Sequence, residues 1–82
     1  MVRTMNELIK NIDKLHTTQL GITRIKRNLE ITGDIVKWCK TKILDKAASI
    51  KKQGKNWYIK IERYIITVNA SSYTIITAHK EK

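Results

Sequence analysis

The first half of the chain spaces its apolar residues three and four positions apart, the interval that lines up one side of an α-helix. This pattern predicts three helices, over about residues 5–15, 20–30 and 34–45. Thr17 or Thr18 is placed to cap the second helix, and Thr32-Gly33-Asp34 separates it from the third. Lysine and arginine fall on the opposite side of each helix, so one side is available for a core and the other for water.

After Asp45 the apolar period changes from 3.6 to 2, the period of a half-buried strand. Strands are predicted over about residues 48–52, 56–62, 64–69 and 73–80. Gly54 lies between the first two strands, where a tight turn needs positive φ. Helices followed by consecutive strands predict one α+β domain over residues 1–82, with three N-terminal helices packed on a three- to four-stranded antiparallel β-meander.

Alternation along the strands assigns each residue to one of two faces. The face against the helices is expected to hold Trp57, Ile59, Ile61, Ile66, Val68, Thr74, Ile76 and Ala78. The outer face is expected to hold Tyr58, Lys60, Glu62, Thr67, Asn69, Tyr73, Ile75, Thr77 and His79. Such a mixture is typical of the solvated face of an antiparallel sheet, and it also contains the groups that a site for a phosphodiester needs.

The chain carries 17 Lys and Arg against 7 Asp and Glu, a net charge of +10 on 82 residues. This surface favours a polyanion, and we expect a nucleic acid, RNA in particular. An acidic protein, an anionic membrane surface, or solubility alone are the alternatives. The expected nucleic-acid contacts are Lys51, Lys52, Lys55, Tyr58, Tyr73, Arg24, Arg27, Lys37 and Lys40. The two tyrosines would stack on unpaired bases.

RNA cleavage through the 2′-hydroxyl needs a base, an acid and a group that stabilises charge on phosphorus. Glu62 or His79 is a candidate base, and His79 a candidate acid. Lys60 or Lys51 would stabilise the charge, and Thr77 would donate to a phosphate oxygen.

The remaining histidine and the cysteine have simpler interpretations. His16 follows the first helix, where it either caps the helix or joins the catalytic groups. Cys39 lies in a helical apolar stripe and is expected in the core. The two histidines and the single cysteine do not have the spacing of metal ligands, so neither a metal nor another cofactor is expected.

Cellular location is also indicated by the sequence. No apolar run approaches the ~20 residues of a membrane span, and the first residues soon become polar and acidic, unlike a secretory signal. A lone Cys39 cannot form an internal disulfide, which fits a reducing compartment. We therefore expect a cytoplasmic protein without a membrane partner.

Four segments together resemble a family of short uncharacterised bacterial and phage-associated proteins, a domain of unknown function: NIDKLHTTQLGITRIKRNL, VKWCKTKI, GKNWYIKI and ITVNASSYTIITAHK. The order of elements, with Thr77-x-His79 on the last strand, is also similar to the barnase, EndoU, colicin and RelE group of ribonucleases. That resemblance implies a working set of His16, Lys51 or Lys60, Thr77 and His79. The chain departs from the group because it is short and because its central strands lack an arginine, Arg63 falling in an expected hairpin turn.

Three functional hypotheses follow. The first is a small RNA-binding protein that acts as a metal-independent, toxin-like ribonuclease on single-stranded RNA, with an antitoxin as partner. The second is a non-catalytic phage or mobile-element accessory protein that inhibits a host defence complex by binding nucleic acid or an acidic protein surface. The third is a homodimer built by pairing an exposed edge strand.

Overall fold

The first predicted helix is two short pieces rather than one. The computed structural model describes residues 7–81, so residues 5 and 6 of that prediction lie outside the described residues. Helix α1 spans Glu7–Lys10, and a 3₁₀ turn, η1, spans Ile12–Lys14. Asn11 separates them, and its side-chain amide donates to the Glu7 carbonyl at 2.9 Å. The Asn11 backbone N–H donates to the same carbonyl at 3.1 Å, and the non-helical φ of −111° at Asn11 then ends α1.

Helices α2 and α3 have defined caps. Helix α2 spans Gln19–Leu29, and the Thr18 hydroxyl accepts a bond from the Gly21 N–H at 3.0 Å. Helix α3 spans Ile35–Leu44, and the Asp34 carboxylate accepts from the Lys37 N–H at 3.0 Å. Each cap satisfies an N–H that the first turn of a helix leaves unpaired.

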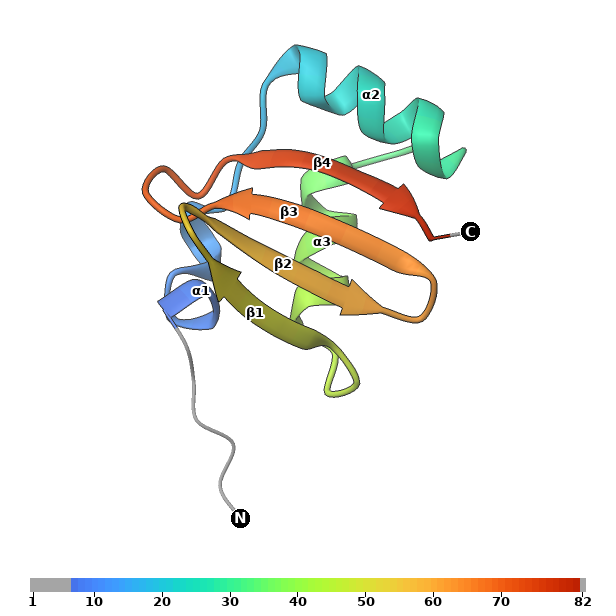
Figure 1. Cartoon of the computed structure of the whole chain (residues 1–82). Helices are drawn as coiled ribbons and strands as arrows, with labels where there is room; N and C mark the ends of the chain where they lie inside the picture. The colour runs from blue at the N-terminus through green and yellow to red at the C-terminus, as the bar shows by residue number, and fades with distance from the viewer. Residues whose placement is uncertain (1–6, 82) are drawn as a thin grey trace.

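The four strands form one antiparallel meander in the order β1-β2-β3-β4. Their bounds are Ser49–Gln53, Asn56–Ile61, Tyr64–Asn69 and Ile75–Lys80. Figure 1 shows helix α3 crossing behind the sheet and helix α2 lying beside strand β4. The structure thus confirms an α+β fold with three N-terminal helices and a C-terminal four-stranded antiparallel sheet.

One core lies between the helices and the sheet. Among its side chains that are almost fully buried are Leu8, Ile25, Cys39, Ile43, Ile59, Ile61, Ile66, Val68, Ile75 and Ala78. Strand β2 alternates as predicted, with Trp57, Ile59 and Ile61 buried. Burying this apolar surface is the main free-energy gain that offsets the loss of chain entropy on folding.

Strand β4 departs from regular alternation. Thr77 lies opposite Thr67, but Val68 lies opposite Ile75, so Ile76 is an extra residue in a β-bulge. Ile75 is 1% exposed and Ile76 is 39% exposed. The prediction that Ile76 faces the core and Ile75 the solvent is therefore wrong, because the bulge reverses the phase of the strand.

Residues before the bulge are also displaced from their predicted faces. Tyr73 has a positive φ of 58° and precedes the strand, so it is not on the outer face. Thr74 forms an isolated parallel bridge with His16 instead of joining the core set. After the bulge, Ala78 points inward and His79 outward, as alternation predicted. Within residues 7–81, none of the helices combines the length and the apolar character needed to cross a membrane.

Candidate nucleic-acid interface

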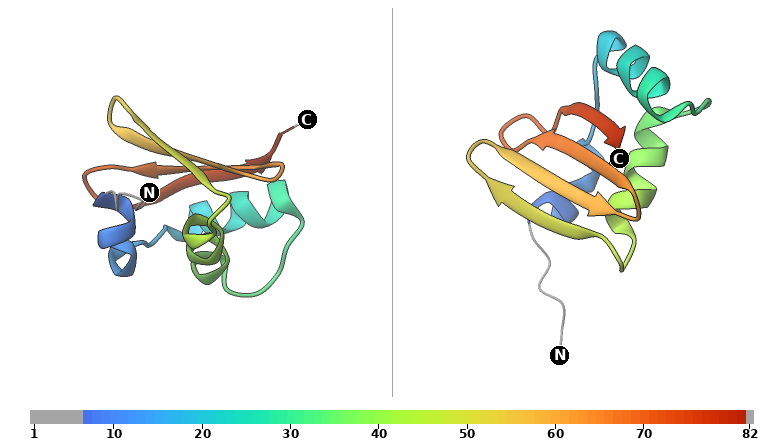
Figure 2. Two further views of the ribbon diagram at one scale, coloured as in Figure 1. Left: turned by 90° about the horizontal axis from the view of Figure 1, so that it is seen from below. Right: turned by 45° about the vertical axis from the view of Figure 1, so that its right-hand side comes forward.

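One face of the sheet carries no helix. Figure 2 shows all three helices on the same side of the strands, which leaves the other side uncovered by the described residues. The strand register aligns two rows of side chains across this side. We call these side chains the open face: Lys51, Tyr58, Thr67 and Thr77 in one row, and Lys60, Ile65 and His79 in the next.

Tyr58 lies in the middle of the open face. It is 39% exposed, and its hydroxyl accepts a bond from the Asn56 side-chain amide at 3.4 Å. Its cross-strand neighbours are Lys51 on one side and Thr67 on the other. Thr67 is buried to 8% exposure, although it points away from the core. A partly exposed aromatic ring beside a lysine is a platform on which an unpaired base stacks while its phosphate meets a cation.

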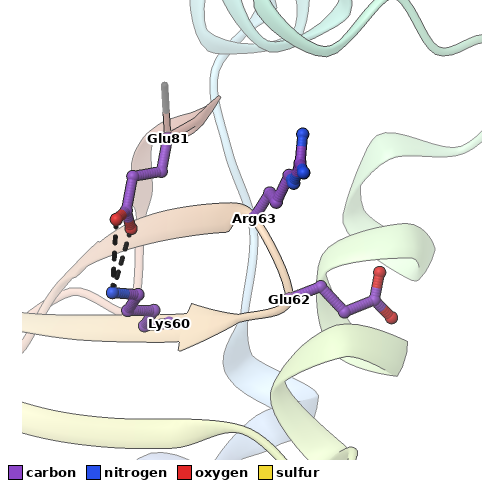
Figure 3. A pocket seen from close by; sticks show the side chains of 4 residues that line it. All are labelled: Lys60, Glu62, Arg63 and Glu81. Atoms are coloured by element: carbon purple, nitrogen blue, oxygen red, sulfur yellow. Dashed lines mark hydrogen bonds and ion pairs between the residues drawn. The ribbon is translucent and has the colours of Figure 1, made fainter.

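Lys60 is neutralised by an acidic residue at the end of the chain. Its Nζ atom lies 3.1 Å from Glu81 Oε2, and the Glu81 N–H donates to the Arg63 carbonyl at 2.6 Å. A hollow of about 330 Å³ beside this pair is lined by Lys60, Glu62, Arg63 and Glu81 (Figure 3). Two cations and two carboxylates balance there, so the hollow has no excess positive charge for a phosphate.

Glu62 is not on the open face. It lies in the turn between β2 and β3 with φ of 56°, and Figure 3 shows its carboxylate directed toward helix α3. There it pairs with Lys42, whose Nζ atom is 3.6 Å away. The predicted position of Glu62 on the outer face is therefore wrong, because alternation ends at Ile61, where the strand ends.

His16 and His79 are at opposite ends of β4. His16 Nε2 lies 3.0 Å from the Thr74 hydroxyl, and its Nδ1 lies 2.8 Å from the Lys14 carbonyl. A carbonyl only accepts, so Nδ1 carries the proton and caps η1. His79 is five residues beyond Thr74, which corresponds to about 16 Å along an extended strand. The two imidazoles therefore do not act on one phosphate.

The remaining basic candidates are spread over the molecule. Lys51 is on the open face, whereas Lys52 points to the helix side, 5.7 Å from the Trp57 ring centroid. Lys55 is in the β1–β2 turn. The other four are in the helical layer: Arg24 and Arg27 on α2, and Lys37 and Lys40 on α3. The basic residues therefore do not form a single patch.

Tyr73 packs beside the core, and the Lys14 ammonium lies 5.8 Å from its ring centroid.

Sequence reasoning missed Ile65 and Glu81, which border the predicted residues. Ile65 belongs to the apolar run Tyr64-Ile65-Ile66, in which the sequence does not indicate which side chain faces the solvent. The strand register shows that it is Ile65. Glu81 lies beyond the predicted strand, and no pattern links it to Lys60.

Cys39 is a core residue. It is fully buried, and burial raises the pKa of its thiol from 9.0 to about 12. The folded chain therefore holds this proton at pH values where the unfolded chain releases it, and alkaline pH favours unfolding above pH 9.

Between pH 8 and pH 10, the free energy of unfolding of the wild type should fall by about 1.4 kcal/mol more than that of Cys39→Ala. Urea titrations of both proteins at these two pH values measure the difference, and parallel pH profiles would contradict it.

The chain was compared with known proteins. The model of a family described as "Protein of unknown function (DUF3781)" matches residues 9–79. Neither the curated proteins nor the solved structures contain a match to this chain. The family match covers all the elements described above except the first residues of α1 and the end of β4.

Proposed function

The chain belongs to the DUF3781 family, and we propose that it is a small RNA-binding protein that holds single-stranded RNA against the open face of its sheet. The observation that carries the proposal is the row Lys51–Tyr58–Thr67–Thr77, on a face that no described helix covers. It places an exposed aromatic ring beside a cation, and the row continues through the buried Thr67 to Thr77.

Single-stranded RNA fits this surface better than a duplex does. Unpaired bases can turn out and stack on a tyrosine, whereas the bases of a duplex are already stacked on one another. Opposite residues in an antiparallel pair have Cβ atoms about 5 Å apart, so Lys51 is within reach of a phosphate next to a base on Tyr58. Thr77 and His79 lie on the same face of β4 and offer donors to the next sugar or phosphate.

The geometry favours binding without cleavage. Of the catalytic candidates, Glu62 pairs with Lys42, Lys60 pairs with Glu81, and His16 lies at the far end of β4. Thr77 and His79 lie together on β4, whereas Lys51, the other charge-stabilising candidate, lies on β1 with two strands between them. A base, an acid and a charge-stabilising group would have to meet at one phosphate for the ribonuclease hypothesis, so cleavage is not part of this proposal.

The proposal is tested by titrating protein into a labelled 20-nucleotide single-stranded RNA and following fluorescence anisotropy at several salt concentrations. We expect binding that weakens as salt rises, because bound cations displace the counterions of the RNA. Lys51→Ala should lower the slope of log K against log salt by about 0.7, the value for one phosphate contact to a single strand. Lys37→Ala is the matched control, since it removes the same charge from helix α3, and it should leave the slope nearly unchanged.

Three outcomes would overturn the proposal. If the protein shows no salt-dependent binding to the RNA, RNA is not its partner. If Lys51→Ala and Lys37→Ala change the slope equally, the open face is not the binding site. If the wild type cuts RNA in EDTA and His79→Ala does not, the protein is a ribonuclease, and the proposal of binding without cleavage is wrong.

A further inference from the structure

One edge of the sheet is covered by other described parts of the chain, and the other edge is not. At the β4 edge, the Thr17 hydroxyl donates to the Ile75 carbonyl at 2.9 Å, and the Asn28 amide donates to the Ala78 carbonyl at 3.3 Å. Helix α2, which follows Thr17 and contains Asn28, lies along that edge (Figure 1). No helix runs along the β1 edge in the same view. The described part of the chain therefore closes one edge and leaves the other open.

Strand β1 directs backbone groups out of the sheet at its open edge. Gln53 lies opposite Asn56 and closes a two-residue turn in which Gly54 has φ of 62°. In an antiparallel pair, residues that bond to the neighbouring strand alternate with residues that do not. Counted from this turn, Ile50 and Lys52 are at positions that do not bond to β2. Their N–H and C=O groups therefore point away from β2. Among residues 7–81, β1 is the first strand of the sheet order and pairs with β2 alone. Such an edge is a template for another strand.

The charges on β1 decide which strand fits. Lys51 points to the open face and Lys52 to the helix side, and no acidic residue lies in the strand. A second copy of β1 would bring lysines opposite or close to lysines, which destabilises the pair. RNA has no amide backbone with which to extend a sheet. We infer that the β1 edge binds an extended acidic segment of another protein as a fifth strand.

The side chains of β1 also predict a pattern in that segment. Neighbouring residues of a strand point to opposite faces, so adjacent acidic residues would meet Lys52 on one face and Lys51 on the other. Ile50 is half-buried on the helix side and lies opposite Ile59. An apolar residue should therefore follow the two acidic ones in an antiparallel segment. This inference does not depend on RNA binding, because the backbone groups of the edge pair with another strand whether or not RNA binds; Lys51 is the one side chain that the two proposals share.

The experiment uses a peptide of defined sequence, acetyl-Ser-Thr-Glu-Glu-Val-Thr-Ser-amide, and the full chain labelled with ¹⁵N. At saturating peptide, hydrogen exchange of the Ile50 and Lys52 amides should slow at least about 10-fold, because both would enter strand hydrogen bonds. Changing either Glu of the peptide to Gln should weaken binding about 1.5- to 5-fold, the range of a cross-strand ion pair. A peptide with Lys in place of both Glu residues should not protect these amides.

Backbone pairing is separated from simple charge attraction by two further peptides, N-methylated at alternate residues in opposite phase. Only the peptide whose methyl groups face β1 should lose binding. Equal binding of both peptides would overturn the inference. So would protection of Ile50 and Lys52 without peptide in a concentration-dependent dimer, which would assign the edge to a second copy. The same protection caused by RNA would also overturn it.

Discussion

Replacing Ile75 with alanine should destabilise the fold by about 2–5 kcal/mol, whereas replacing Ile76 should change stability by about 0.5 kcal/mol or less. Ile75 is 1% exposed and Ile76 is 39% exposed, although the two are neighbours of the same residue type. Removing the buried side chain loses its transfer free energy and leaves a cavity, whereas removing the exposed one does neither. The contrast between the two variants is a direct test of the bulge in β4.

Urea unfolding followed by circular dichroism measures both effects, with equal m-values showing that the denatured states are comparable. A domain of this size has a total stability of only about 4–12 kcal/mol, so Ile75→Ala alone could unfold it. Ile75→Val is the milder variant, with an expected loss of about 0.5–1.5 kcal/mol, and Ile76→Val is its matched control. A larger loss at position 76 than at position 75 would mean that β4 pairs without the bulge.

This pair of isoleucines also shows where the sequence stops being informative. Strand β2 alternates strictly from Trp57 to Ile61, so its buried face followed from period 2 alone. In β4 the two isoleucines are adjacent, and either one satisfies an apolar inward position. A bulge shifts the alternation between inward and outward side chains by one residue, and no particular residue type in β4 marks its position. The choice depends on the pairing with β3, which no local pattern contains.

The same distinction holds for the candidate site. Tyr58, Lys60, Thr77 and His79 were assigned to the outer face, and the structure places them on the open face because pairing is regular along β2 and, in β4, from Thr77 onward. Their functional roles remain predictions. Glu62 was misplaced because its direction follows from the φ of a turn residue rather than from alternation. Ion pairs such as Lys60–Glu81 join residues far apart in sequence and follow only from the fold.

Replacing Tyr58 with alanine should weaken binding of single-stranded RNA about 5- to 150-fold, the equivalent of about 1–3 kcal/mol for one stacked base. Tyr58→Phe should bind nearly as well as the wild type, because it keeps the aromatic ring and loses only the hydroxyl that contacts Asn56. Tyr58→Leu should bind about as weakly as Tyr58→Ala, since leucine restores apolar bulk without a π-face. Thermal unfolding of each variant checks that the sheet is intact.

A duplex of the same RNA separates stacking from general attraction by charge. Its bases are unavailable to Tyr58, so Tyr58→Ala should leave the salt-dependent affinity for the duplex within about twofold of the wild type. Lys51→Ala should weaken binding to either form through the lost phosphate contact. Equal loss of single-strand and duplex binding in Tyr58→Ala would contradict stacking, because only a change of structure or charge acts on both. Unchanged single-strand binding in Tyr58→Ala would move the RNA site away from the open face, since Tyr58 is the aromatic residue that this face exposes.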